Sequence, residues 1–200
     1  PCPEVESQRG AWKGTPLHEA INRNDVDAVR DRLTATTLKE RDSFGNTPLI
    51  AALTPSAALE PAGVVKADTA RARIQAEQSA RLTIVSALLA KGASVNERGA
   101  EGVTPLTQLA GWGFSPAADR RLTDQFLRLG ADVNARDDFG STALMLAASR
   151  GKAGLVKLLL SQGADPAAKN CRGDTAASLA QVGGYRAVAR VLSTYAPRPR

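Results

Sequence analysis

The chain has 200 residues, of which 43% are hydrophobic and only 4% aromatic, and its formal net charge is +6. No stretch approaches the roughly 20 apolar residues of a membrane-spanning helix, and zinc-finger spacing, an aromatic–basic ribonucleoprotein motif and a long Lys/Arg block are all missing, which argues against a nucleic-acid partner. The positive charge, mostly arginine, therefore indicates either a solvated surface or an acidic partner.

A phrase that begins with Thr occurs five times, first as Thr15-Pro16-Leu17-His18. A second phrase, which begins Gly-Ala, closes the second, third and fourth copies. Neighbouring copies are 32 or 33 residues apart where they are regular, and 57 and 38 residues apart where they are stretched. Recurrence at such a period indicates a repeat architecture. The copies begin at Thr15, Thr47, Thr104, Thr142 and Thr175, and the closing glycines are Gly92, Gly130 and Gly163.

Each position of these phrases has a physical role in helix formation. The Thr hydroxyl can accept a backbone N–H and cap a helix, and Pro at the first helical position costs no hydrogen bond. A Gly after the second helix suits a left-handed C-cap. Asp42, Asp137 and Asn170 lie at the turns before the Thr residues, where their side chains can bond the local backbone.

On these residues, the region from about 14 to 192 resembles the ankyrin repeat. The resemblance implies an all-α solenoid of helix-turn-helix units with β-turn fingers. Residues 1–13 are expected to be a lead-in and 193–200 a basic tail. In chain order, the repeats are expected at about 14–40, 41–96, 97–134, 135–166 and 167–192, and the second helices of the first, second, fourth and fifth repeats at 26–33, 84–89, 155–160 and 185–192.

The second and third repeats carry insertions of 24 and 5 residues, at about 54–81 and 111–120. No Gly or Pro occurs from Ala67 to Lys91, so we expect an extended helix in the second repeat whose first part projects beyond the stack. The spacing of Arg73, Glu77 and Arg81 allows i,i+4 ion pairs. The shorter insertion places two aromatic residues in a Gly-flanked loop, and both insertions are expected at one edge of the solenoid.

No constellation of catalytic groups is evident. His18 is the only histidine, and the resemblance implies that it hydrogen-bonds neighbouring turns. Asp137-Asp138 looks like a carboxylate pair, but Asp137 occupies the ordinary turn position of the repeat. We therefore expect no enzyme activity, no cofactor and no metal site.

The two cysteines are Cys2 and Cys171. Stacked helix pairs are roughly 10 Å apart, so four steps separate the two ends of the solenoid by about 40 Å. The residues from Cys2 to Thr15 span at most about 44 Å when fully extended. A disulfide between the cysteines is therefore barely within reach, and we expect it not to form.

Two surfaces are candidates for partner binding. The resemblance implies a concave surface of turns, here Phe44, Asn46, Glu101, Asp138, Phe139, Arg172 and Asp174. The edge with the insertions is rich in aromatic residues and arginine, which are enriched at binding hot spots. Its candidates are Arg71, Arg73, Arg81, Trp112, Phe114, Arg120 and Arg121. Alternatively, the two aromatics seal the base of the long helix and the arginines form a solvated face.

The resemblance implies a non-enzymatic protein–protein interaction module that is a monomer when free. High Ala and Arg content and irregular repeats look like bacterial ankyrin proteins, some of which resemble immunity proteins that block secreted toxins such as phospholipase effectors. Segment 54–81 would then cover the active site of the toxin. The alternative is an envelope-associated adaptor that binds anionic lipid or an acidic partner through its arginines. Pro-Cys-Pro-Glu at the start suits a periplasmic or envelope-associated protein after leader cleavage, with the cytoplasm as the alternative.

Overall fold

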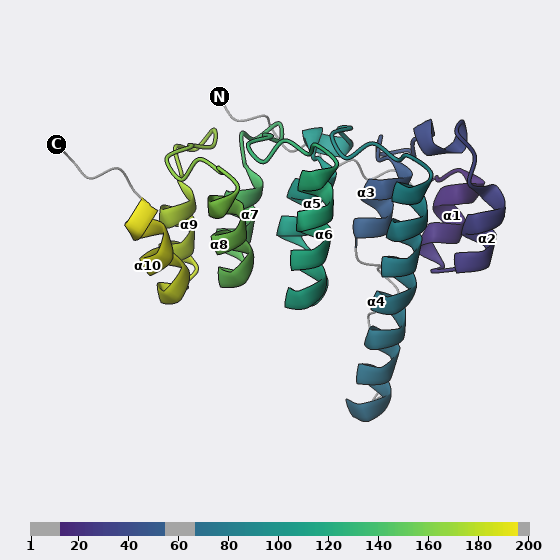
Figure 1. The fold of residues 1–200 in the computed structure, drawn as a ribbon, viewed down its shortest axis with the longest axis horizontal. Helices are drawn as coiled ribbons and strands as arrows, with labels where there is room; N and C mark the ends of the chain where they lie inside the picture. Colours follow the sequence, from purple (N-terminus) through teal and green to yellow (C-terminus); the bar gives the residue numbers. More distant parts are fainter. Residues whose placement is uncertain (1–12, 55–66, 196–200) are drawn as a thin grey trace. The chain divides into compact units, whose positions relative to one another are not determined.

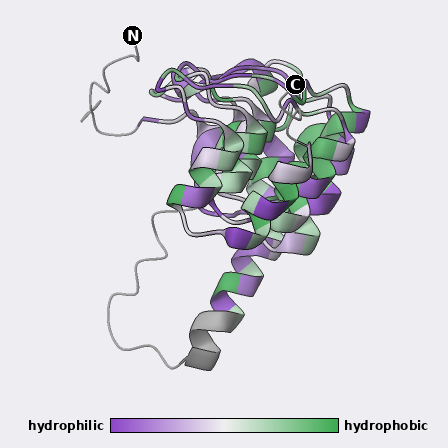
Figure 2. Ribbon diagram, turned by 90° about the vertical axis from the view of Figure 1, so that its left-hand side faces the viewer, coloured by the Kyte–Doolittle hydropathy of each residue, from purple (hydrophilic) through white to green (hydrophobic). Residues whose placement is uncertain are grey.

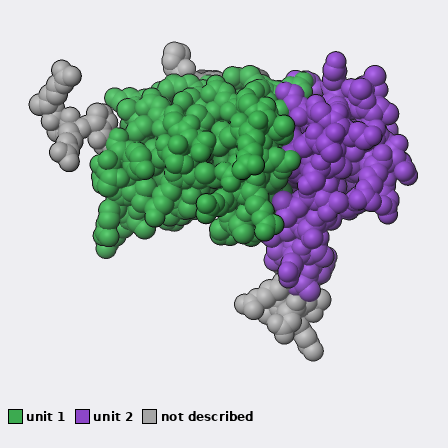
Figure 3. Space-filling model, viewed as in Figure 1, with its two compact units in different colours: residues 1–9, 95–200 green, residues 10–94 purple. Residues whose placement is uncertain are grey.

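The computed structural model describes residues 13–54 and 67–195, and the side chains of 67–71 are not part of that description. The described residues divide between two compact units (Figure 3). The N-terminal unit contains 13–54 and 67–94, and the C-terminal unit contains 95–195.

The N-terminal unit consists of two helix pairs and a short 3-10 turn (Figure 1). In chain order its elements are α1 (Pro16–Asn22), α2 (Val26–Arg32), the turn η1 (Thr37–Lys39), α3 (Pro48–Leu53) and α4 (Ala67–Ala90). The first helix of each pair is short, and the second helix of the second pair is the 24-residue α4.

The C-terminal unit consists of three helix pairs, each of which follows a turn. Its elements are the 3-10 turn η3 (Ala100–Gly102), α5 (Pro105–Gly111), α6 (Pro116–Arg128), α7 (Ala143–Ser149), α8 (Ala153–Ser161), α9 (Ala176–Val182) and α10 (Arg186–Tyr195). Within the described ranges the only extended pairing is an isolated antiparallel bridge between Arg136 and Thr142. The predicted all-α fold of helix-turn-helix units is confirmed.

The repeated Thr caps the first helix in four of the five repeats. The hydroxyl groups of Thr47, Thr104, Thr142 and Thr175 each accept the N–H three residues on, as the sequence predicts. Thr15 differs, because its Oγ1 lies 2.9 Å from His18 Nδ1 and caps no backbone N–H. The His of the first phrase thus replaces the helix cap with a side-chain contact.

The closing glycines end the second helices as predicted. Gly92, Gly130 and Gly163 have φ values of +87°, +85° and +85°. Their N–H groups donate back to Leu89, Leu127 and Leu160 at 3.0–3.1 Å. A side chain is disfavoured in this left-handed conformation, so glycine fixes where each helix ends.

The core of each unit lies between its stacked helices, where Leu, Ile and Ala predominate. In the N-terminal unit the largest fully buried side chains are Leu17, Ile21, Leu49, Ile50, Leu53, Ile84 and Leu88. In the C-terminal unit they are Leu106, Leu109, Phe126, Leu144 and Met145. Burial of an aliphatic side chain contributes about 1.5–3 kcal/mol, so stability is distributed along the stack.

Helix α4 confirms the extended helix of the second repeat. Its C-terminal part packs in the core through Ile84, Val85, Leu88 and Leu89. Residues 72–76 are all exposed, and this part extends well past α3 (Figure 1). Hydrophilic and hydrophobic residues alternate along it without a continuous apolar stripe (Figure 2). The described side chains of 72–76 therefore do not pack on their own unit.

Candidate partner-binding surfaces

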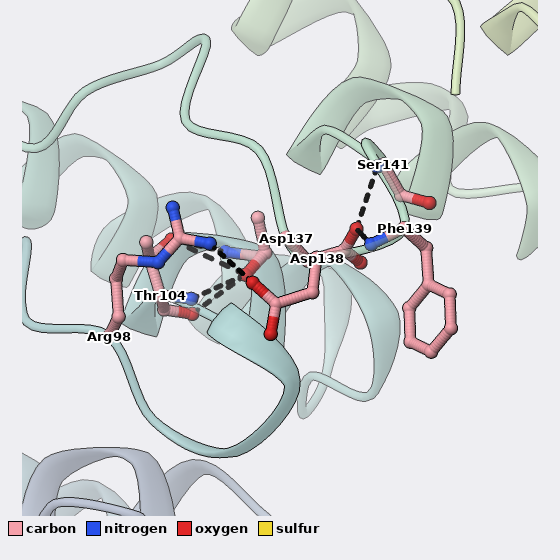
Figure 4. A network of polar contacts seen from close by, with 7 residues as sticks. Arg98, Thr104, Asp137, Asp138, Phe139 and Ser141 are labelled. Carbon is pink, nitrogen blue, oxygen red and sulfur yellow. Dashed lines mark hydrogen bonds and ion pairs between the residues drawn. The ribbon is translucent and has the colours of Figure 1, made fainter. Parts of the chain in front are cut away.

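We call the turn that opens a repeat a finger. Polar side chains shape the fingers of the second, fourth and fifth repeats. Asp137 Oδ1 accepts the N–H groups of Phe139 and Ser141 at 3.0 and 2.7 Å (Figure 4). Asn170 does the same for Arg172 and Asp174, both at 2.9 Å. In the N-terminal unit, Asp42 holds its finger in the same way. The predicted turn role of Asp42, Asp137 and Asn170 is confirmed.

Burial raises the pKa of the Asp137 carboxyl, and the neighbouring charge of Asp138 adds to this effect. The hydrogen bonds from Ser141 and Phe139 and the charge of Arg98 act against it. Asp138 is held in turn by Arg98, whose Nη2 lies 2.8 Å from Asp138 Oδ1 (Figure 4). The two carboxylates therefore have structural partners.

Hydrogen bonds join the fingers of the C-terminal unit in series. The N–H of Asp138 donates to Glu101 O, and the N–H of Cys171 donates to Phe139 O, both at 2.9 Å. One finger lacks the turn carboxylate, and there Glu101 adopts a left-handed φ of +54°. Because each finger is bonded to the next, their tips form one continuous surface of this unit.

The Asn residues of the closing phrases join each closing phrase to the next one. Asn96 Nδ2 donates to Gly130 O at 2.7 Å, and its Oδ1 accepts the N–H of Asp132 at 2.9 Å. Asn134 repeats this arrangement one repeat later, with Gly163 and Asp165. Each carboxamide thus donates to a backbone carbonyl at a helix C-terminus, where carbonyls have no partner within the helix.

The predicted concave-turn residues divide between the two units. The C-terminal unit places five of them on successive fingers: Glu101, Asp138 and Arg172 are exposed, while Phe139 and Asp174 are half-buried. Phe44 and Asn46 are half-buried in the N-terminal unit. Asn46 is a structural residue, because its carbonyl lies 3.1 Å from His18 Nε2.

His18 has the structural role that the resemblance implies. Its side chain is fully buried and joins Thr15 to the finger carbonyl of Asn46. Burial lowers the pKa of the imidazole, although the hydrogen bond to Asn46 and the charges of Asp42 and Glu40 oppose the shift. This buried histidine, with a partner at each ring nitrogen, therefore links two repeats of the N-terminal unit.

The predicted edge residues on α4 differ in their exposure. Arg73 is exposed and makes no ion pair with a described residue, whereas the side chain of Arg71 lies outside the described part of the chain. Arg81 is 3% exposed. The placement of α4 and Trp112 on one shared edge concerns two different units and stays a prediction.

Arg81 corrects the prediction of a partner contact. Its Nε lies 3.2 Å from Glu77 Oε1, and its Nη1 donates to the carbonyls of Ala52 and Thr54 at the end of α3. Burial lowers the pKa of the guanidinium, and Glu77 opposes that shift. The prediction was wrong for Arg81 because the short α3 leaves unpaired carbonyls that this side chain satisfies.

The loop between α5 and α6 holds the predicted aromatics. Trp112 is 54% exposed, and Arg150 Cζ lies 5.1 Å from the centre of its ring. Phe114 is half-buried, and its N–H donates to Asp119 Oδ1 at 2.6 Å. Asp119 also pairs with Lys152 at 3.1 Å. The predicted Arg120 and Arg121 are exposed on α6.

Sequence reasoning missed three residues near these joins. Arg150 contacts Trp112, Lys152 pairs with Asp119, and Tyr185 lies between α9 and α10. The repeat register contained the signal for the first of these. Trp112 and Arg150 each come eight residues after the capping Thr of their repeats, so equivalent positions of stacked units were bound to be neighbours.

Cys171 is disulfide-bonded, which contradicts the expectation that the cysteines stay apart. The other cysteine in the sequence is Cys2, which lies outside the described residues. The expectation depended on an ideal spacing of stacked helix pairs. The greatest span of the residues from Cys2 to Thr15 was close to the distance that this spacing gives between the two ends.

Within the described ranges, no group of His, Cys, Asp and Glu side chains could hold a metal ion. A search of the same residues for a helix long and apolar enough to cross a membrane found none.

Stacked helix pairs, with fingers bonded in series in the C-terminal unit, define a repeat protein of the helical solenoid class. The chain belongs to the ankyrin-repeat family. The family model described as "Ankyrin repeats (3 copies)" matches residues 114–199, and the finger and capping phrases extend the same pattern to the N-terminal unit. Ankyrin repeats are protein–protein interaction modules.

Relatives of the chain include ankyrin-repeat proteins of animals and a fungus. It is 34% identical over 114 residues to ankyrin repeat and KH domain-containing protein mask-1 of Caenorhabditis elegans, covering 56% of this chain and 4% of the relative. Identity to human ankyrin repeat domain-containing protein 63 is 38% over 95 residues, 48% of this chain and 25% of the relative. Ankyrin repeat domain-containing protein SAT10 of Stachybotrys chartarum is 31% identical over 151 residues, 74% of this chain and 6% of the relative. The chain thus spans a quarter or less of each.

Proposed function

We propose that this chain is a non-enzymatic module that binds another protein through the exposed part of α4, residues 72–76. The observation that carries the proposal is the contrast within this one helix. Its C-terminal part packs in the core, whereas residues 72–76 are exposed and include Ile74 at 43% exposure. Ordering a helix beyond the stack costs conformational entropy, and contact with a partner offsets that cost.

The finer proposal is an inhibitor, similar to bacterial immunity proteins that block a secreted toxin such as a phospholipase effector. A projecting helix supports it, because such an element can enter a concave active site and exclude substrate without chemistry of its own. The absence of an apolar stripe on residues 72–76 fits a polar, charged target surface rather than an apolar groove.

A deletion that removes the projection and keeps its anchor tests this proposal. The deletion should end at residue 76, because Glu77 holds Arg81 and Arg81 closes α3. Affinity capture from cells of the natural source would compare the intact chain with the 56–76 deletion. We expect one stoichiometric partner that the deletion loses while its helical content and melting transition are retained.

A matched pair of triple variants serves as the control. Arg73→Ala, Ile74→Ala and Gln75→Ala change the exposed part of α4, whereas Asp27→Ala, Arg30→Ala and Asp31→Ala change an exposed part of α2 in the same unit. Only the first triple should weaken capture. A partner that both triples and the deletion retain would exclude α4 as the binding element.

We also propose an oxidising compartment, periplasmic or envelope-associated, rather than the cytoplasm. The disulfide-bonded Cys171 supports this, because disulfides persist in oxidising compartments and are rare in the cytosol. Thiol labelling of the protein taken directly from source cells tests it. Unlabelled Cys171 is the expected result, and a freely labelled thiol would favour the cytoplasm.

A second candidate is an adaptor that binds anionic lipid or an acidic partner through arginine. The observation in its favour is the exposure of Arg120, Arg121, Arg128, Arg186 and Arg190 on the outer helices of the C-terminal unit. Exposed charges are screened beyond about 8 Å at physiological salt. A steep loss of binding with added salt would support this candidate, and binding insensitive to salt would exclude it.

A further inference from the structure

Side chains at the joins between paired helices form a continuous strip on the C-terminal unit. Trp112 and Arg150 are the C-cap residues of α5 and α7, and Arg150 lies over the Trp112 ring at 5.1 Å. The next residue, Gly151, lies against the Tyr185 ring, since a Cβ there would be 2.5 Å from Tyr185 Cε1. We call Trp112, Arg150 and Tyr185 the join strip. The joins from α5 to α6, from α7 to α8 and from α9 to α10 lie at the lower ends of these helices in Figure 1, opposite the fingers.

The join strip is exposed but its rings are held in place. Trp112 is 54% exposed and Tyr185 is 38% exposed, and Val182 beside them is 87% exposed. The Tyr185 ring lies between Gly151 and Gly183, where added Cβ atoms would be 2.5 and 2.6 Å from its carbon atoms. Both positions therefore exclude larger residues, and the aromatic faces are preorganised, which reduces the entropic cost of binding.

Positive charge surrounds the strip and is not neutralised within the unit. The guanidinium groups of Arg120, Arg121, Arg150 and Arg186 are exposed, and none makes an ion pair or hydrogen bond with a described residue. The one carboxylate near the strip, Asp119, is 4% exposed and is bonded to Lys152 and to the N–H of Phe114. The exposed charge at the joins is thus exclusively positive among the described residues.

The fingers and closing phrases at the other end of the same helices are net negative, with seven carboxylates against the four basic residues Arg98, Arg136, Lys169 and Arg172. Only Asp119 and Asp124 are acidic on the helices and joins of this unit. The remaining carboxylates lie on the fingers and closing phrases: Glu97, Glu101, Asp132, Asp137, Asp138, Asp165 and Asp174. Such a separation steers an acidic ligand toward the joins and away from the fingers.

We propose that the join strip binds an acidic polypeptide segment of a partner. Asp or Glu side chains of the segment pair with the exposed arginines, which can bind carboxylates in a bidentate way. An apolar side chain of the segment packs on Trp112 and Tyr185. Aromatic residues and arginine are the types that dominate binding hot spots. This inference rests on the proposed protein-binding function and adds a second surface to it.

The geometry favours a polypeptide over an anionic membrane surface. Aromatic residues that anchor proteins to membranes place their rings at the headgroup level. The Tyr185 ring instead packs against two backbone segments, and the Trp112 ring faces Arg150. Flat aromatic faces beside arginine suit an extended chain that lies across them.

A titration followed by NMR tests the proposal on the whole chain. The probe is a synthetic peptide of Glu and Asp around a central Leu-Phe pair, added to isotope-labelled protein at physiological salt. We expect the largest shifts at the Trp112 indole N–H and at the amides of 150–151 and 183–186. The variant Trp112→Ala should bind the peptide about tenfold more weakly and keep the melting temperature, because the side chain is exposed.

Two charge-reversal triple variants distinguish a specific binding site from non-specific attraction between charges. Arg120→Glu, Arg121→Glu and Arg186→Glu change the surroundings of the strip, and Arg128→Glu, Lys169→Glu and Arg172→Glu make the same charge change elsewhere on this unit. The first triple should weaken binding by about tenfold or more and the second by less than about twofold, because distant charges are screened.

Each other outcome overturns the proposal in a distinct way. Equal weakening by both triples would mean non-specific charge attraction. Shifts confined to the fingers would keep the protein-binding function and remove the strip as its site. If the protein sediments with phosphatidylserine vesicles and the peptide causes no NMR shifts, the arginines bind a membrane surface instead. If a saturating amount of peptide causes no shift at all, the strip does not bind an acidic polypeptide.

Discussion

Arg81 Nε lies 3.2 Å from Glu77 Oε1, and both side chains are largely buried at the place where the projecting half of α4 meets its unit. The pair holds the projection to the end of α3, because the same guanidinium donates to the carbonyls of Ala52 and Thr54. The element proposed to bind a partner is thus anchored by an arginine that is not itself available to that partner.

Replacement of this arginine should be strongly destabilising. Arg81→Met removes one partner of a buried pair, and we expect a loss of about 3–5 kcal/mol in the free energy of unfolding, measured by urea denaturation. The double variant Arg81→Met with Glu77→Gln should recover part of that loss. Arg73→Met on the exposed part of the helix should change stability by less than about 0.5 kcal/mol, and equal effects of Arg81→Met and Arg73→Met would show that the pair contributes nothing.

His18 predicts a dependence of stability on pH. Because burial lowers its folded-state pKa below 6.5, the unfolded chain binds more protons as pH falls below that value. Stability is then fully present above the unfolded pKa and declines as pH falls toward the folded pKa. Urea midpoints between pH 7.5 and pH 5.5 should fall for the native chain and fall less for His18→Gln; identical slopes would refute the assignment.

Two glycines of the C-terminal unit should respond to alanine in opposite directions. Gly102 has φ +70°, and a Cβ there would lie 2.8 Å from Asp138 Cγ. Gly102→Ala should therefore cost about 1–3 kcal/mol. Gly154 lies in α8 with no atom near its Cβ position, so Gly154→Ala should stabilise by about 0.4–1 kcal/mol. Thermal unfolding measures both, and a neutral Gly102→Ala would contradict the close approach of Arg98 and Asp138.

The carboxamide ladder between the closing phrases should show in hydrogen exchange. Asn134→Ala removes the acceptor of the Asp165 N–H and the donor to Gly163 O. We expect about 1–2 kcal/mol of destabilisation and faster exchange at Asp165. Exchange at Asp132, which is held by Asn96, should change far less, and an equal change at both amides would mean that the ladder acts only through global stability.

The repeat phrases predicted most of the fold because their positions act locally. A capping Thr such as Thr142, or a closing Gly such as Gly130, acts on the helix next to it, so spacing alone locates the helix ends. Thr15 does not follow this rule, because His18 competes for its hydroxyl group. The disulfide of Cys171 was not predicted, because the repeat phrases carry no information on covalent links.

The candidate surfaces were only partly predictable. Sequence identified Trp112 as an aromatic in a loop, and the structure leaves it exposed. It could not show that Arg81 is buried, because that depends on where α3 ends and which carbonyls remain unpaired. Arg150 and Tyr185 were missed because each looks unremarkable in its own repeat, and only stacking brings them to one strip.

Site-specific photo-crosslinking tests the central claim, that the exposed part of α4 binds a protein. A photoreactive amino acid would replace Ile74, which is 43% exposed, and in a second variant Asp31, which is exposed on α2 of the same unit. The account predicts one discrete adduct from position 74 in source cells and none from position 31. Adducts from both positions, or none from position 74 while the intact chain still captures its partner, would contradict it.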